Sequence, residues 1–158
     1  MAYFHLQHWF SLAVFFIPLI TGMSGNVGIQ CSTILVRGMA TGEVSPGTRK
    51  QVVIRELAIG HLIGIAFGIV SGLIVYLLNV LNVHKFAVDP IVVGTIVSCG
   101  LLGACLTATA LGTFSPLIFA RWRIDPAVAS GPIVTAFNDV LSTFMYFFIA
   151  KIISAHFL

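Results

Sequence analysis

The length of the apolar stretches most constrains what this chain can fold into. A helix needs roughly 20 apolar residues to cross a bilayer, and four stretches are long enough, at residues 9–40, 52–81, 91–120 and 126–157. Only 8% of the 158 residues are charged, whereas soluble domains carry about 25%. The sequence therefore predicts an all-α fold, in which residues 1–158 form a single transmembrane domain of about four spanning segments in a lipid bilayer.

Basic residues gather at the ends of these stretches and mostly on one side of the membrane. The first loop is flanked by Arg37, Arg49, Lys50 and Arg55, the third carries Arg121 and Arg123, and the opposite side has only Lys85 and Lys151. Because cytoplasmic loops are rich in Lys and Arg, we expect the first and third loops in the cytoplasm of a cell membrane and both termini outside. This placement explains the net charge of +3 without nucleic acid as a partner.

One acid, Asp139, is set deep inside an apolar stretch. It lies about 13 residues into the last stretch, or roughly 20 Å along a helix. A carboxylate at that depth is costly unless it faces water, a cation or a partner, and no basic residue occurs at a comparable depth. Helical spacing places Thr135, Ser142, Thr143 and Tyr146 on the same side as Asp139. We therefore predict an ion or proton site at Asp139, with Ser142 lining its path.

The first stretch is unusually polar and rich in glycine near its middle. Gly22, Gly25 and Gly28 alternate there with Asn26 and Gln30, which are poor choices for an ordinary spanning helix. Irregular backbone at membrane depth is tolerated where it lines a cavity or is buried in protein. We therefore expect the helix to be interrupted near residues 22–28, with Asn26 and Gln30 lining a pore. A glycine-rich packing kink is the alternative.

The second stretch carries a glycine at every fourth position from Gly60 to Gly72. A stripe of small residues lets helix backbones approach closely in a bilayer, so we predict tight helix packing there and no chemistry. The three cysteines have neither a CxxC nor a zinc-site spacing. No Ser/His/Asp arrangement is present either, and we do not expect an enzyme.

The ligands expected around Asp139 do not choose among ions. Oxygen ligands suit a hydrated Mg²⁺, which keeps its inner waters reluctantly, but they would suit a proton relay or Na⁺ equally well. One carboxylate is little charge for a divalent ion. A symmetric homodimer would bring two copies of Asp139 to one axis, and this favours a dimer.

Three stretches are similar to a known family when they are taken together. They are Pro18 to Gly42 (PLITGMSGNVGIQCSTILVRGMATG), the pair Arg55-Glu56, and Asp125 to Val140 (DPAVASGPIVTAFNDV). They resemble the membrane domain of MgtE-type magnesium transporters and channels, from about Phe16 to the C-terminus. The resemblance implies transport of Mg²⁺ by a homodimer whose pore lies between the subunits.

The resemblance also implies roles for single residues. The aspartate matching Asp139 holds a hydrated Mg²⁺ in the family, and backbone oxygens matching Gly25, Gly28 and Thr135 help to accept its waters. Ser32 and Gly131 match a narrow cytoplasmic part of the family pore. The chain departs from the family pattern at Ser24, Ala136 and Ser142, where glycine, threonine and glycine are common.

Compared with the family, the chain lacks the first of five spanning helices and the cytoplasmic region with paired CBS domains. Gating through those domains cannot operate in this chain alone, so we expect a fragment of a longer protein or a short relative with different regulation. The leading hypothesis is Mg²⁺ permeation through a dimer pore. The alternatives are another cation or proton-coupled transporter, and a truncated membrane subunit that does not transport.

Overall fold

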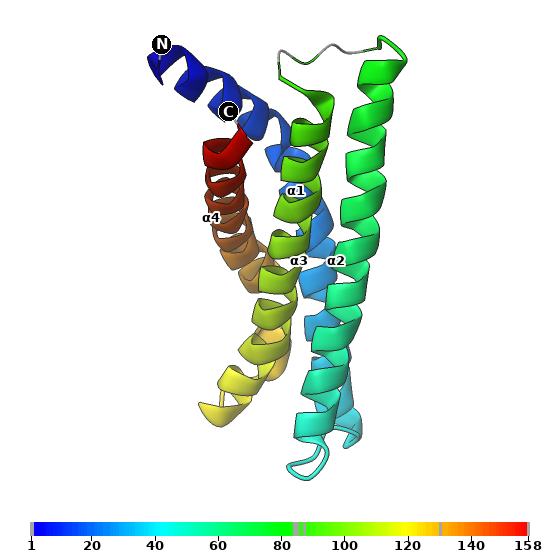
Figure 1. Cartoon of the computed structure of the whole chain (residues 1–158). Helices are drawn as coiled ribbons and strands as arrows, with labels where there is room; N and C mark the ends of the chain where they lie inside the picture. Colours follow the sequence, from blue (N-terminus) through cyan, green and yellow to red (C-terminus); the bar gives the residue numbers. More distant parts are fainter. Residues whose placement is uncertain (1, 84–85, 87, 130, 158) are drawn as a thin grey trace.

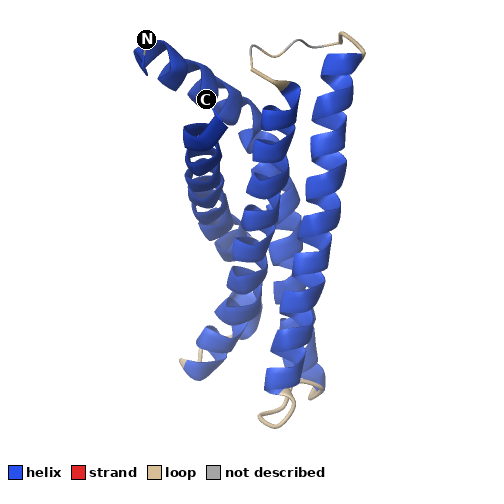
Figure 2. Ribbon diagram, viewed as in Figure 1, coloured by secondary structure: helices blue, strands red, loops and turns tan. Residues whose placement is uncertain are grey.

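The computed structural model of this chain describes residues 2–83, 86, 88–129 and 131–157. Its elements are α1 (Ala2–Thr41), α2 (Arg49–Val80), α3 (Pro90–Arg121), the short 3-10 helix η1 (Pro126–Ala129) and α4 (Pro132–Phe157). Figure 2 shows that short loops join these helices. All of α2, α3 and α4, and residues Ala13–Thr41 of α1, are long and apolar enough to cross a membrane. The predicted all-α fold is confirmed.

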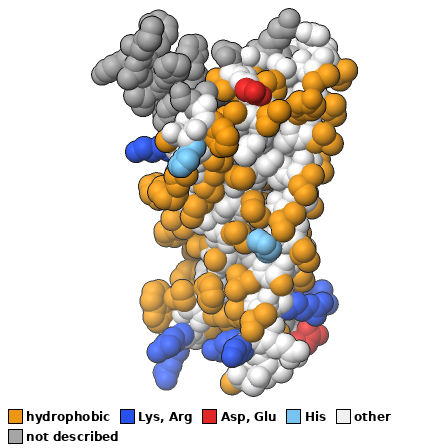
Figure 3. Space-filling model, in the orientation of Figure 1, with side chains coloured by type: hydrophobic (Ala, Val, Ile, Leu, Met, Phe, Trp, Pro, Cys, Tyr) orange, Lys and Arg blue, Asp and Glu red, His pale blue; other side chains and the backbone are white. Residues whose placement is uncertain are grey.

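The four α-helices run alternately in opposite directions (Figure 1). Both termini and the α2–α3 connection lie at one end of the bundle, and the other two connections lie at the opposite end. Lys and Arg side chains gather at that opposite end in Figure 3. This agrees with the charge pattern of the sequence, although Lys85 lies outside the described residues, and the cytoplasmic placement of this end stays a prediction.

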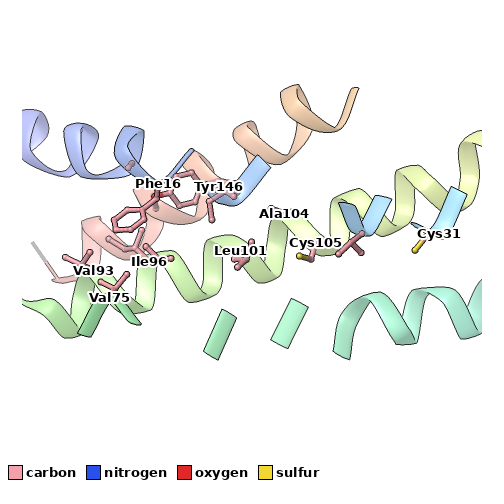
Figure 4. Packing of buried hydrophobic residues seen from close by; sticks show 14 residues of the cluster. Phe16, Cys31, Val75, Val93, Ile96, Leu101, Ala104, Cys105 and Tyr146 are labelled. Atoms are coloured by element: carbon pink, nitrogen blue, oxygen red, sulfur yellow. The ribbon is translucent and has the colours of Figure 1, made fainter. Parts of the chain in front are cut away.

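Helix α3 lies at the centre of the bundle and packs against α1, α2 and α4. Its buried residues form the middle of the core, with Leu101, Ala104 and Cys105 fully covered. Figure 4 shows Phe16 of α1 and Tyr146 of α4 beside one another above the line of α3. The core therefore lies along α3, while α1 and α2 have little direct contact with each other.

The interruption expected near residues 22–28 is not present, because α1 is one continuous helix from Ala2 to Thr41. A helix satisfies its backbone N–H and C=O groups internally, which a bilayer demands, and the glycines serve close packing instead. The Cα of Gly28 lies against the carbonyl of Ala108 in α3. The N-terminal part of α1 does run at an angle to the rest (Figure 1), and Pro18 inside the helix accounts for a kink.

The last helix starts later than the sequence indicated. Asp125 accepts a hydrogen bond from the N–H of Ala127 at 2.9 Å, but the turn that it caps is η1 rather than α4. Gly131 has φ of +89°, a conformation that suits glycine and ends the preceding turn. Its carbonyl then accepts the N–H of Thr135 at 2.9 Å, so α4 begins at Pro132.

The glycine stripe of α2 packs on α3, as predicted. A Cβ added at Gly68 would lie 2.8 Å from the carbonyl oxygen of Ser98, and one at Gly64 would lie 3.1 Å from the Cβ of Cys105. The Ser98 hydroxyl also donates to the Gly68 carbonyl at 2.8 Å. This α2–α3 pair forms a close-packed unit beside the helices that carry the candidate site.

Candidate cation-binding site

Asp139 is exposed on α4 and is the only carboxylate among the residues described in that helix. Because α4 begins at Pro132, Asp139 lies roughly 10 Å from the start of the helix, about half the depth that the sequence indicated. Within the described part of the chain, its carboxylate has no hydrogen bond or ion pair. Thr135 and Thr143, one turn away on either side, are half-buried. An unpaired carboxylate thus stands on the surface of a spanning helix.

Helix α1 presents a polar stripe on its own exposed face. Its members follow one another at intervals of three or four residues, which places them on one side of the helix: Gly22, Asn26, Gln30, Thr33 and Arg37. All five are exposed, although they belong to a stretch that is apolar enough to span a membrane. The predicted positions Asn26 and Gln30 are both on this stripe.

Helices α1 and α4 are in direct contact, and this contact lies at the level of Asp139. The Nδ2 of Asn138 donates to the Oγ of Ser24 at 3.2 Å. One turn further along, a Cβ added at Gly28 would lie 3.4 Å from a methyl group of Val134. The two helices therefore run antiparallel at close range.

Asp139 and the polar stripe of α1 each lie on an exposed surface of their own helix. Met145 and Ile149 of α4 face Gly103 of α3 and lie within about 20° of Asn138 around the helix, whereas Asp139 lies about 100° away from Asn138. On α1, Gly28 faces α3, and Asn26, two residues earlier, points to roughly the opposite side. Asp139 and Asn26 are therefore both turned toward the outside of the bundle.

Several residues that the sequence placed at the site lie inside the bundle instead. Ser32 and Ser142 have no exposed surface, and Gly25 and Gly28 are buried. The Cα of Gly112 in α3 packs directly on the Gly28 carbonyl oxygen, so this oxygen points toward α3 and not toward the exposed stripe. These four residues do not share a surface with Asp139 in this arrangement.

Two further predicted residues, Thr135 and Gly131, are hydrogen-bonded to each other. The Thr135 hydroxyl donates to the carbonyl of Gly131 at 3.0 Å. Gly131 lies at the turn between η1 and α4 rather than on a helix face. Of this pair, Thr135 lies one turn from Asp139, and Gly131 is half-buried at the end of the helix.

The polar face expected on α4 combines buried and exposed residues. Asn138, Ser142 and Tyr146 follow one another at intervals of four residues, and all are buried. Asp139 lies about 100° around the helix from Asn138, but only about 60° from Ser142 and about 20° from Tyr146. Asp139 is nevertheless exposed, whereas Ser142 and Tyr146 are covered by α3.

Asn138 and Ser24 are the residues that sequence reasoning missed. Both have no exposed surface, and their side chains connect α4 with α1. A signal was present, since Asn138, Ser142 and Tyr146 are polar residues at four-residue intervals in an apolar helix. Such a stripe marks an inward face that needs hydrogen-bond partners.

A second layer of polar side chains lies toward the start of α2, apart from Asp139. Glu56 is 4% exposed, and its Oε2 has no hydrogen-bond partner in the described residues. The hydroxyls of Ser32 and Thr113 are buried and unpartnered in the same way. Glu56 is the second carboxylate that the described part of the chain places within a spanning helix. Its side chain is enclosed by protein, whereas the side chain of Asp139 is exposed.

The exposed surface around Asp139 offers a carboxylate and few other charges. Among the residues that the structure describes, no three His, Cys, Asp or Glu side chains gather closely enough to hold a metal ion. Amide and carboxylate oxygens suit hard cations, and they suit a hydrated ion that needs hydrogen-bond acceptors rather than many direct ligands.

Comparison with known proteins points to cation transport. Residues 17–149 match the family model MgtE, described as a divalent cation transporter. Over 140 residues the chain is 34% identical to the magnesium transporter MgtE of Bacillus subtilis (strain 168), which covers 86% of this chain and 28% of that protein. It is 30% identical over 147 residues to the magnesium transporter MgtE of Enterococcus faecalis (strain ATCC 700802 / V583), covering 93% of the chain and 30% of that protein. The chain spans less than a third of the length of these relatives.

Proposed function

Because this chain belongs to the MgtE family of divalent cation transporters, we propose that it conducts Mg²⁺ across a membrane along the outer surface of α1 and α4. The observation that carries this proposal is the unpaired, exposed carboxylate of Asp139 on a spanning helix that packs against α1, which carries an exposed polar stripe of its own. An acid inside a spanning helix is costly unless water or a cation reaches it. A path for a hydrated cation provides both.

Mg²⁺ would pass this point with its water shell. The ion dehydrates reluctantly and requires near-octahedral oxygen geometry, which one carboxylate and a few amide groups do not provide directly. Asp139 would accept hydrogen bonds from the waters and supply the negative charge. Asn26 and Gln30 on α1, and Thr135 on α4, would offer further polar contacts. Gly25 and Gly28 would act by letting α1 approach its neighbours closely. Their carbonyls would reach the ion only if α1 turns during transport.

A second copy of the chain would complete the path. Large apolar side chains are exposed on the other sides of α4, with Phe137, Val140 and Phe144 at 59%, 68% and 69% exposure. Exposed apolar surface on a helix that also carries an unpaired carboxylate suits an interface between protomers better than contact with lipid alone. A two-fold axis next to Asp139 would place two Asp139 carboxylates around one ion. We therefore propose a homodimer with the pore between its subunits.

In such a dimer the remaining predicted residues would lie toward the cytoplasm. The end of the bundle that carries the α1–α2 and α3–α4 loops is rich in Lys and Arg (Figure 3), so we assign it to the cytoplasmic side. Ser32 and Gly131 lie toward this end, and Ser142 lies nearer the middle of α4. All three would line the pore only if the helices separate, because they are covered or half-buried in this arrangement.

The direct test is Mg²⁺ flux by the 158-residue chain in liposomes that contain a Mg²⁺-sensitive dye. We expect flux from the unaltered chain and a loss of at least ten-fold in Asp139→Ala. Glu43→Ala is the matched control, because Glu43 is an exposed acid in the α1–α2 loop. Equal flux through the chain and Asp139→Ala would refute the assignment of Asp139.

The same liposomes separate the alternatives. Competition by Co²⁺, Mn²⁺ or Na⁺, or a requirement for a pH gradient, would identify another cation or a proton as the coupled species. No flux from the chain alone, with flux restored by a co-purifying partner, would identify a subunit that transports only in an assembly.

A further inference from the structure

A buried hydrogen-bonded network lies directly behind Asp139. At its centre is the side-chain amide of Asn138, whose Nδ2 donates to the Ser24 hydroxyl of α1 at 3.2 Å. Its Oδ1 accepts the hydroxyl of Ser142 at 2.7 Å. The oxygen of Ser142 also lies 3.3 Å from the carbonyl oxygen of Ala104 in α3. The network therefore touches three helices at the level of the proposed ion.

The network has one consistent arrangement of donors and acceptors. Ser24 donates to the carbonyl of Thr21 at 3.3 Å, so its oxygen is free to accept from Asn138. The single hydroxyl hydrogen of Ser142 is used best at 2.7 Å, on Asn138, rather than at 3.3 Å on Ala104. The amide of Asn138 is thereby oriented from both sides, with its NH₂ group toward α1.

A directed cross-link of this kind sets the rotation of a helix about its own axis. Helices in a bilayer have no hydrophobic drive to associate, and apolar side chains tolerate small rotations with little change in contact. A hydrogen-bonded amide tolerates much less, because its strength depends on distance and angle. Since Asp139 follows Asn138 by one residue, its direction is fixed at about 100° from the amide.

We propose that Asn138 is a positioning residue that holds the carboxylate of Asp139 on the exposed side of α4. The inference rests on the proposed function, in which Asp139 holds the hydrated ion. Ser24 anchors the amide on α1, and Ser142 orients it. Asn138 itself has no exposed surface, so it acts on the ion only through the direction of α4.

The first experiment measures Mg²⁺ flux in liposomes as a function of Mg²⁺ concentration. Asn138→Leu keeps a side chain of similar size but removes both hydrogen bonds, and we expect at least a ten-fold loss of flux at low Mg²⁺ with a raised half-saturating concentration. Ser154→Ala is the matched control: Ser154 is also buried on α4, but its hydroxyl bonds only to Ala150 of the same helix at 2.7 Å. It should leave the flux within two-fold.

A rescue variant separates positioning from a general loss of packing. The exchange Ser24→Asn with Asn138→Ser places the amide on α1 and the hydroxyl on α4, so the cross-link can form in reverse. We expect the double variant to recover at least half of the flux lost in Asn138→Ser alone. Failure of this rescue, or unchanged flux in Asn138→Leu, would overturn the proposal.

The second experiment reads the rotation of α4 without any transport. Cys31 and Cys105 are buried, so replacing the exposed Cys99 by Ala gives a background with little thiol reactivity. Asp139→Cys and Phe137→Cys are then labelled separately with a charged, water-soluble thiol reagent. We expect fast labelling at position 139 and at least ten-fold slower labelling at position 137, which lies on the apolar side of α4.

Adding Asn138→Leu should bring the two labelling rates to within about three-fold of each other. Rates that keep their original ratio would overturn the positioning role. If the unaltered chain shows no Mg²⁺ flux, the proposed function fails, and the labelling ratio still decides whether Asn138 sets the direction of position 139.

Discussion

The α2–α3 interface and the α1–α4 interface are held together in different ways. Between α2 and α3, glycines bring the two backbones into contact, and Gly68 and Gly94 pack against the backbone of the facing helix. Between α1 and α4, the connection is the hydrogen bond from Asn138 to Ser24. One interface depends on the absence of side chains, and the other depends on the direction of a polar side chain.

The two interfaces also treat their carboxylates differently. Glu56 at the start of α2 is buried, with an oxygen that has no partner in the described part of the chain. Asp139 on α4 is exposed. Close backbone contact leaves no room for water or an ion between α2 and α3. We therefore propose that α2 and α3 form a scaffold and that α1 and α4 carry the ion path.

The largest effect is expected in the ion path, from Asp139→Asn. This change keeps the shape of the side chain and removes its charge. A hydrogen bond to a charged group is worth about 1.5–3 kcal/mol, so we expect Mg²⁺ flux to fall by roughly 10- to 100-fold with little change in melting temperature. Flux and thermal unfolding of the same purified sample in detergent and liposomes check this, and a large drop in melting temperature would place Asp139 in the scaffold instead.

The next effect is expected at the scaffold, from Gly68→Ala. The new Cβ would lie 2.8 Å from the Ser98 carbonyl oxygen, and a backbone atom cannot move aside as a side chain can. Overpacking of this kind costs about 1–3 kcal/mol. We expect lower thermal stability and less folded protein, with normal flux per folded molecule. Reduced flux at full stability would show that α2 belongs to the path.

A smaller effect of opposite sign is expected from Glu56→Gln. A neutral amide is less costly to bury than a carboxylate without a cation, so we expect a gain of about 1 kcal/mol, or roughly 2–4 °C in Tm for a chain of this size. Flux should be unchanged. Glu43→Gln in the exposed loop is the control and should shift neither quantity. Destabilisation by Glu56→Gln would reveal a bound water or ion that needs the carboxylate.

The smallest effect is expected from Gly22→Ala on the polar stripe of α1. A Cβ added there has no atom within 4 Å, and alanine favours a helix over glycine by roughly 1 kcal/mol at most. We expect stability to stay equal or rise slightly, and flux to stay within two-fold. This is the same substitution as Gly68→Ala, so a large loss at Gly22 would mean that a second chain packs closely on the stripe.

Much of the fold was predictable, because the bilayer allows few solutions. Four apolar stretches predicted four helices, and α3 begins beside the predicted stretch, where the Asp89 carboxylate accepts the N–H of Ile91 at 2.8 Å. The glycine stripe of α2 predicted its own packing. The continuity of α1 was not predictable from composition, because glycine suits both a broken helix and a close-packed one. The choice between them depends on whether a neighbouring helix is near.

The candidate site was predicted in part. The depth argument singled out Asp139, which is exposed, and the polar residues Asn26 and Gln30 do lie on an exposed stripe of α1. Four other residues were expected at the site but are buried: Ser32, Ser142, Gly25 and Gly28. Their burial could not be predicted, because it depends on which side of each helix meets α3. Asn138 was overlooked beside Asp139, although one residue along a helix separates an inward direction from an outward one.

The sequence by itself determined that this chain forms membrane-spanning helices, and it singled out Asp139 as the acid set within the last of them. Both follow from the cost of polar groups in hydrocarbon, which acts on each residue regardless of its neighbours. Only the tertiary structure decided that Asp139 faces outward while Asn138 turns inward to hold α4 against α1. That choice depends on the rotation of one helix against two others, and contacts between distant parts of the chain set that rotation.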